Sequence, residues 1–182
     1  MNLFVLDVLP ENAARYHCDK HVVKMIVETA QMLSTVLRER GKQSVSGVPL
    51  YKATHANHPC TKWVAASVGN FDWALRLGLA LLEEYRIRYG KRHKTTDLLH
   101  AIALAYPPTL FPTDFVMAMP EQFQNPKSVV LSYRTYIAAS KHHFAKWAKA
   151  TPEPTWWRER REYVINNNLE VENTSNDGIS YR

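Results

Sequence analysis

The stretch that decides the fold is HCDKHVVKMIVETAQMLSTVL, residues 17–37. Six polar side chains in it recur at alternating steps of four and three residues, so they share one face of a helix. They are His17, His21, Lys24, Glu28, Gln31 and Thr35. The residues between them are mostly apolar, and the pattern therefore predicts a narrow polar seam on a hydrophobic helix.

A polar seam of this kind indicates a pocket, because burying an ionisable group costs free energy unless the group is paired, and such a cost is tolerated at a functional site. Under this interpretation Glu28 acts as an acid or a base, with its proton affinity set by its neighbours. The alternative is purely structural, since Lys24 and Glu28 are four residues apart and can neutralise each other.

Two other kinds of chemistry are weighed at the same helix. His17 and His21 have a spacing that can bind zinc, but the chain has no HExxH motif and Lys24 beside them disfavours a cation. Cys18 is poorly placed to be a nucleophile assisted by His17, because consecutive residues of a helix point about 100° apart. We therefore predict neither a metal nor another cofactor.

The rest of the chain also has a helical pattern. Residues 2–7 (NLFVLD) are expected to be extended and buried, and only six glycines interrupt the 182 residues. Helices are predicted over residues of about 11–40, 57–89, 97–106, 126–149 and 155–165. We predict an all-α protein, a single-domain helical bundle over residues 1–166 with a short extended N-terminal segment. Residues 167–182 lack apolar periodicity and are expected to form a loosely ordered tail.

The composition points to an anionic partner and to the cytoplasm. The formal net charge is +6, which favours nucleic acid or a nucleotide, although many proteins are mildly basic. The chain shows no run of about 18 apolar residues that could span a membrane, and no basic segment that begins a signal peptide. Its two isolated cysteines fit a reducing compartment. We expect a soluble monomer in the cytoplasm of a bacterial or phage-infected cell.

Candidates for substrate binding come from the polar seam, from basic clusters and from aromatic residues. The basic clusters are residues 86–94, 141–149 and 158–161, and each could equally be a solvated face. Trp156 could stack on a base or pack into the core, and His58 could face the pocket or simply begin a helix. The substrate-binding candidates are His17, Gln31, His58, Asn70, Arg88, Lys91, His93 and Trp156.

Four stretches of the chain resemble the pyrimidine-dimer DNA glycosylase (endonuclease V) family of phages and bacteria. HVVKMIVETAQMLSTVL at 21–37 is similar to the family's first long helix, which carries a histidine and, seven residues later, a catalytic glutamate. The segment at 57–85 is similar to the next long helix, with a histidine at its entrance. MPEQF at 119–123 and PTWWRERREYVI at 154–165 resemble the family's Pro-x-x-Phe turn and its closing aromatic segment.

The resemblance implies a helical fold and a DNA glycosylase with AP-lyase activity. The terminal α-amine of such an enzyme attacks the sugar C1′ and forms an imine, and the strand then breaks by β-elimination. Glu28 takes the place of the catalytic glutamate, with His21 and Lys24 beside it. The amine belongs to Met1 or, if methionine is removed, to Asn2. Asparagine is a large residue, so we expect Met1 to be retained.

The chain departs from the family beside the glutamate. Basic residues of the family flank the glutamate and hold DNA phosphates, whereas Val27 and Gln31 stand in those places here. Two alternatives to a glycosylase follow: a phage enzyme of the same fold that processes a nucleotide or modified base without cutting DNA, and a non-enzymatic protein that binds nucleic acid. The target base, and the choice between DNA and a free nucleotide, stay open.

Overall fold

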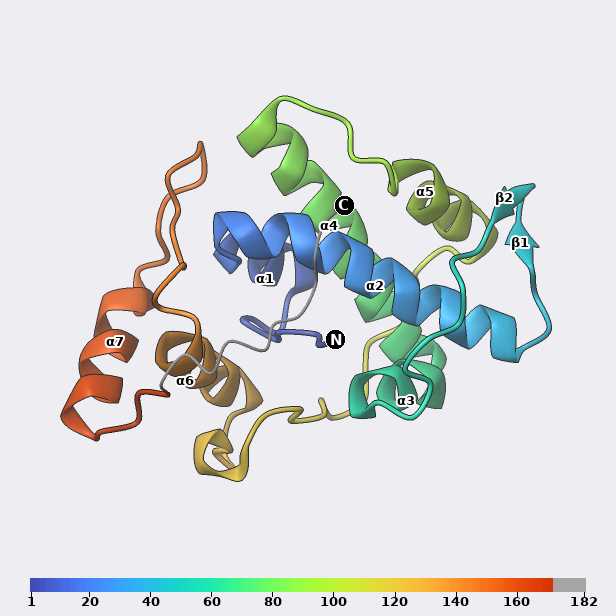
Figure 1. Ribbon diagram of the computed structural model, residues 1–182. Helices are drawn as coiled ribbons and strands as arrows, with labels where there is room; N and C mark the ends of the chain where they lie inside the picture. The colour runs from blue at the N-terminus through green and yellow to red at the C-terminus, as the bar shows by residue number, and fades with distance from the viewer. Residues whose placement is uncertain (172–182) are drawn as a thin grey trace.

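Two long helices cross at the centre of the molecule, and the remaining elements pack around them (Figure 1). The computed structural model describes residues 1–171 of the chain. Helix α2 (Asp19–Glu39) lies across α4 (Val68–Tyr89), and most of its apolar residues, among them Met25, Ile26 and Leu33, are completely buried. Burial of this apolar surface is the main source of stability. The polar seam is buried at His21, Glu28 and Thr35 and partly exposed at Lys24 and Gln31.

The other elements are short. They are α1 (Pro10–Tyr16), strands β1 (Ser44–Val45) and β2 (Val48–Pro49), α3 (Pro59–Ala66), α5 (Thr96–Ala105), the 3₁₀ turn η1 (Glu121–Phe123), α6 (Val129–Ser140) and α7 (Trp156–Asn166). The two strands form one antiparallel hairpin in which Val45 pairs with Val48. The structure thus confirms the prediction of an all-α, single-domain fold. None of the described helices combines the length and the apolar character that a membrane span requires.

The segment before α1 is buried, as predicted, and it forms no helix and no strand with any part of the chain that the structure describes. Residues 3–6 are at most 6% exposed. Two backbone carbonyls of the segment accept hydrogen bonds from side chains. Arg134 Nε donates to the carbonyl of Leu6 (2.9 Å), and Trp73 Nε1 donates to that of Val8 (2.8 Å). Helices α4 and α6 therefore fix the path of this segment, and with it the position of the first residues of the chain (Figure 1).

The helix predicted over residues 11–40 is wrong in one respect, because the chain breaks it at His17 and Cys18, which are extended. The reason is a long-range contact. The guanidinium group of Arg88 donates to the carbonyl oxygens of Arg15 (2.9 Å) and His17 (2.8 Å), which the break leaves without helical partners. Its ion pair with Asp19 (3.1 Å) ties the first turn of α2 to the same point.

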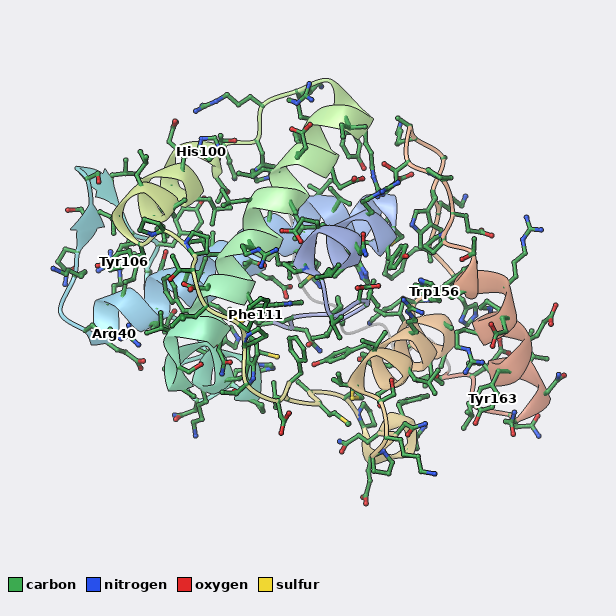
Figure 2. All side chains as sticks on the ribbon, turned by 180° about the vertical axis from the view of Figure 1, so that it is seen from behind. Arg40, His100, Tyr106, Phe111, Trp156 and Tyr163 are labelled. Carbon is green, nitrogen blue, oxygen red and sulfur yellow. The ribbon has the colours of Figure 1, made fainter. Side chains whose placement is uncertain are left out.

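The helix predicted over residues 57–89 is also interrupted, at Ser67, whose side chain caps α4 by accepting from the amide of Asn70 (3.0 Å). The side chain of Asn70 donates in turn to the carbonyl of Trp63 at the end of α3 (2.8 Å). Gly69 then allows a close approach, because a Cβ there would lie 1.8 Å from the carbonyl oxygen of Phe111. The ring of Phe111 itself is 86% exposed (Figure 2).

The C-terminal part differs from prediction in two further places. Helix α6 ends at Ser140 instead of near residue 149, because the returning chain bonds to α2: the amide of Asp19 donates to the carbonyl of Lys146 (2.9 Å). Glu170, which lies beyond α7, forms an ion pair with Arg161 of that helix (2.6 Å). Most of the predicted loose tail, residues 172–182, lies outside the described residues, so the boundary at residue 166 stays a prediction.

Two buried histidines pack around the N-terminal segment. The ring of Phe4 stacks on His21 (centroids 4.9 Å apart, 18° between planes), and His17 Nδ1 donates to the carbonyl of Ala13 (2.6 Å). Burial lowers the pKa of His17 to about 4, and it lowers the pKa of His21 well below its ordinary value. Both rings are therefore neutral parts of the core at physiological pH.

The first prediction concerns Arg88, whose side chain is 0% exposed and pairs with Glu84 (2.9 Å) and Asp19. Arg88→Met leaves two buried carboxylates and two carbonyls short of a partner, so it should lower the free energy of unfolding by about 3–5 kcal/mol in urea denaturation. Arg86→Met is the control, because Arg86 is an exposed arginine of the same helix paired with Glu83. Equal effects of the two substitutions would contradict the assigned role.

The second prediction concerns acid stability. Below pH 6.5 the histidines of the unfolded chain bind protons, whereas the buried histidines of the folded protein stay neutral. The free energy of unfolding therefore falls as the pH decreases. Above pH 6.5 the histidines are neutral in both states and have no effect on stability. With ~1.4 kcal/mol per pKa unit, His17 alone should cost about 2 kcal/mol between pH 6.5 and 5 and about 3 kcal/mol by pH 4. Urea unfolding of wild type and His21→Phe at pH 7 and 5 tests this, since the variant should lose less stability than wild type.

Candidate active site at the start of the chain

Glu28 lies in the middle of α2, and the chain brings its own first two residues to this carboxylate. The side chain of Glu28 is 9% exposed, and its Oε2 accepts a hydrogen bond from the backbone amide of Asn2 (2.8 Å). The terminal nitrogen of Met1 lies 3.9 Å from the same oxygen. Lys24, one turn earlier on α2, places Nζ 3.6 Å from the other oxygen, Oε1. An α-amine and a carboxylate thus share one buried site.

Three separate elements hold Asn2. Its side-chain Nδ2 donates to the carbonyl of Ala118 (2.8 Å), while its Oδ1 accepts from the hydroxyl of Tyr133 on α6 (3.4 Å) and from the thiol of Cys60 on α3 (3.5 Å). Both polar atoms of the Asn2 side chain and its backbone amide therefore have a partner. The consequence is a fixed direction for the residue before it, which carries the amine.

The side chain of Met1 is packed and not free. It is 3% exposed, and the hydroxyl of Thr61 on α3 lies 3.8 Å from its sulfur, to which it can donate. Because both the methionine side chain and Asn2 are held, the terminal nitrogen has little conformational freedom. Pre-positioning of this kind lowers the entropic cost of bringing a nucleophile to its target.

Cys60 and Tyr133, which both contact the side chain of Asn2, are neutral groups. Burial raises the pKa of the Cys60 thiol to about 11, and it raises the pKa of Tyr133 well above its ordinary value. Both side chains therefore stay protonated at neutral pH and act as hydrogen-bond donors. Burial also raises the pKa of Cys18, which argues against a thiolate nucleophile at that position.

His58 lies at the entrance of the site. It is the N-cap of α3, where its Nδ1 accepts from the amide of Cys60 (3.2 Å). Burial lowers the pKa of His58, and the positive charge of the Met1 amine lowers it further. Because Nδ1 is an acceptor, the neutral ring carries its proton on Nε2 and can donate it to a ligand.

The predicted site residues separate into two groups. Those that the structure brings together are Met1, Asn2, Lys24, Glu28 and, at the edge, Gln31 and His58. The others serve the core or lie elsewhere. His17, His21, Asn70 and Arg88 are buried in contacts described above. His93 is buried beside Tyr85 (4.9 Å between ring centroids), Trp156 packs on Arg134 (5.0 Å), and Lys91 is exposed after α4.

Sequence reasoning missed three residues that shape the site, namely Cys60, Thr61 and Tyr133. Cys60 and Thr61 lie in the first turn of α3, directly after the His58 that was predicted, and that proximity was the one available signal. Tyr133 contacts Asn2 across 131 residues of sequence, so no local pattern could have indicated it.

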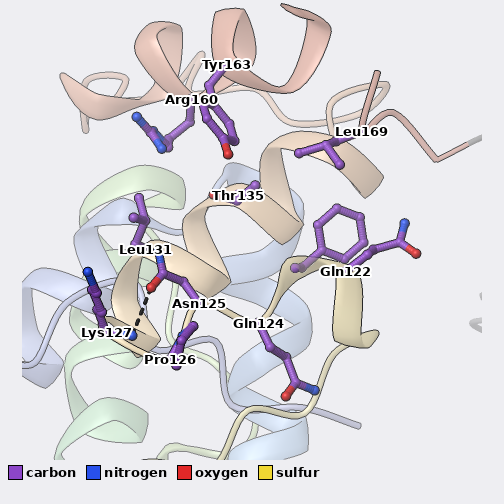
Figure 3. Close-up of a pocket in the computed structure, with 11 residues that line it drawn as sticks. Gln122, Gln124, Asn125, Pro126, Lys127, Leu131, Thr135, Arg160, Tyr163 and Leu169 are labelled. Carbon is purple, nitrogen blue, oxygen red and sulfur yellow. Dashed lines mark hydrogen bonds between the residues drawn. The ribbon is translucent and has the colours of Figure 1, made fainter. Parts of the chain in front are cut away.

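The described residues offer no centre for a metal ion. Residues 1–171 contain no group of three or more His, Cys, Asp or Glu side chains placed to hold one. A cavity of about 440 Å³ between η1, α6 and α7 is lined by polar residues such as Gln124 and Arg160 (Figure 3). None of the residues lining it bonds to Asn2 or Glu28, so it is separate from the amine.

Comparison with known proteins assigns the chain to a family. The family model described as pyrimidine dimer DNA glycosylase matches residues 1–97, which include the amine, Glu28 and the first turn of α3. No curated protein and no solved structure matches the chain. Because the match covers 97 of the 182 residues, more than half, the chain belongs to the pyrimidine dimer DNA glycosylase family.

Proposed function

We propose that the protein is a DNA glycosylase and AP lyase that acts on damaged or modified pyrimidines. The α-amine at the start of the chain is its nucleophile, and Glu28 is its acid–base group. The observation that carries the proposal is the buried pair formed by the Met1 nitrogen and Glu28 Oε2, 3.9 Å apart. Family membership supports a glycosylase function, and the contacts of Asn2 support the assignment of roles.

The chemistry requires a neutral amine next to a carboxylate. The nitrogen lone pair attacks C1′ of the target nucleotide while the bond from C1′ to the base breaks, and the sugar ring then opens to give an imine. Glu28 can accept the proton that the nitrogen loses and can stabilise the positive charge that develops on the sugar. Loss of a proton from C2′ with departure of the 3′ phosphate then cuts the strand.

The two oxygens of Glu28 have different partners, which fits this division of work. Lys24 lies near Oε1, while Oε2 faces the Met1 nitrogen and accepts from the Asn2 amide. The hydrogen bond from the Asn2 amide orients the carboxylate, so Oε2 stays directed at the start of the chain. Lys24 is 29% exposed, which leaves its ammonium group available to a substrate phosphate.

A second candidate function keeps the site and changes the substrate. Val27 and Gln31 stand beside Glu28 in place of basic residues, so α2 offers fewer phosphate contacts than a DNA-cutting enzyme would use. An enzyme that processes a nucleotide or modified base without strand cleavage fits this observation. Activity on free nucleotides, without trapping on abasic DNA, would favour it.

The third prediction tests Glu28. Glu28→Gln keeps the shape of the side chain but removes its ability to take a proton, so cleavage of abasic-site DNA should slow by about 100-fold or more. Glu39→Gln, on the same helix at an exposed position, is the matched control and should cleave at the wild-type rate. Single-turnover cleavage measures both variants, and an unimpaired Glu28→Gln enzyme would rule out the assigned role.

The fourth prediction identifies the nitrogen. Borohydride reduction during turnover should fix the sugar on the α-amine of Met1, because the large asparagine at position 2 favours retention of the methionine. Peptide mass spectrometry of the trapped complex reads the attachment point. Attachment to an N-terminal Asn2 would mean that methionine is removed, which would leave the new amine 2.8 Å from Glu28. Attachment to a lysine side chain would refute the amine mechanism.

A further inference from the structure

The geometry points to a phosphate-binding subsite in the cavity beside Glu28, in which Lys52 and Lys94 hold a phosphate group of the substrate. The inference deepens the proposed function, on which it rests for the identity of the substrate as a nucleotide or a DNA strand. It assigns phosphate binding to two loops outside α2. No pattern in the sequence indicated that the two lysines act together.

The cavity has a volume of about 570 Å³ and is lined by six residues: Val27, Gln31, Tyr51, Lys52, Thr54 and Lys94. This volume is within the range of about 300–1,000 Å³ that holds small ligands in proteins. Val27 and Gln31 are the neighbours of Glu28 along α2, and Gln31 shares its polar seam. Neither Glu28 nor Met1 lines the cavity, so a phosphate held there would lie about one helical turn along α2 from the carboxylate, on the side of Gln31.

The charge of the lining favours an anion. Two of the six lining residues are lysines and none is acidic. Within residues 1–171, neither Lys52 nor Lys94 forms an ion pair with a carboxylate. The cavity thus carries two positive charges that are not neutralised locally, and lysine ammonium groups are common partners of phosphate.

The loop that carries Lys52 is attached firmly to α2. The amide of Tyr51 donates to the hydroxyl of Ser34 (3.2 Å), and the amide of Thr54 donates to that of Thr35 (3.1 Å). Arg38 Nε also donates to the carbonyl of Tyr51 (2.6 Å). Figure 1 shows this segment, which follows β2, crossing α2 on its way to α3. Lys52 therefore has a fixed base from which its side chain reaches the cavity.

The turn that carries Lys94 is held as well. The hydroxyls of Tyr51 and Thr95 are hydrogen-bonded (2.8 Å), which joins the two lysine-bearing segments directly. The amide of Thr95 donates to Nδ1 of the buried His93 (3.2 Å). Because both segments are fixed and bonded to each other, the two lysines are held at one cavity, unlike two unrelated lysines on a solvated face.

The floor of the cavity is suited to the rest of a nucleotide. The side chain of Gln31 makes no hydrogen bond within the described residues, and it is partly exposed, so its amide can both donate to and accept from a sugar or base. Val27 and the ring of Tyr51 provide apolar surface. The shared chemistry is a phosphate with an attached sugar, and it can come from a DNA strand or a free nucleotide.

The fifth prediction tests the two lysines. Lys52→Met/Lys94→Met should weaken binding of thymidine 5′-monophosphate, of DNA with a non-cleavable abasic analogue, or of both, as measured by fluorescence anisotropy and calorimetry. The slope of log affinity against log salt concentration for DNA should fall in magnitude by about 2, ~1 for each lysine. The matched control is Lys42→Met/Lys127→Met, which removes the same charge at two exposed positions away from this cavity.

The ligands separate the possible sources of the phosphate. A loss confined to DNA assigns the phosphate to a strand, and a loss for the monophosphate assigns it to a free nucleotide. Thymidine, which lacks phosphate, should respond equally to both double variants. If the Lys52/Lys94 variant binds each phosphate ligand as tightly as the Lys42/Lys127 control, or if wild type binds neither ligand, the subsite does not exist.

The same experiment distinguishes failure of the subsite from failure of the proposed function. Phosphate binding that depends on Lys52 and Lys94, together with no borohydride trapping, would retain the subsite and remove the lyase mechanism. Trapping at the wild-type rate with unchanged binding in the Lys52/Lys94 variant would retain the mechanism and remove the subsite. Urea unfolding of both double variants should match wild type, because all four lysines are exposed.

Discussion

The hydrogen bond from the Asn2 amide to Glu28 is the contact on which the site depends. A carboxylate inside a helical core is tolerated only when its charge is compensated. Here the compensating groups come from the first two residues of the chain and from Lys24, one helical turn away. The buried charge and the chain terminus thus stabilise each other, and the arrangement that satisfies the carboxylate also positions an amine beside it.

Buried polar side chains create the geometry in which this contact forms. Arg88 donates to the carbonyls that have no helical partner where α1 ends. Asn70 joins the end of α3 to the start of α4. These two breaks set the directions of α2, α3 and α4 around the N-terminal segment. Both residues have the polar, hydrogen-bonding character expected of a substrate contact, yet their donors and acceptors are used within the protein.

The groups near the start of the chain differ in charge from those at the cavity. Cys60 and Tyr133 are kept neutral by burial, and both donate to the side chain of Asn2. The cavity is lined by two lysines, Lys52 and Lys94, and by Gln31, which lies one turn beyond Glu28 on α2. The proposed subsite and the proposed chemistry therefore meet along this helix.

Local pattern accounts for a defined part of this protein. The periodicity of residues 17–37 was sufficient to predict a buried seam containing Glu28, and the apolar run at the start predicted a docked N-terminal segment, because both signals arise between residues close along the chain. Local pattern could not predict where the long helices break, at residues 17–18 and at Ser67. Nor could it predict the contacts of Arg88 and Tyr133, or that Lys52 and Lys94 line one cavity. Each depends on hydrogen bonds or on a cavity shared between distant segments, and the requirement that buried polar groups find partners is met only when the whole chain has packed.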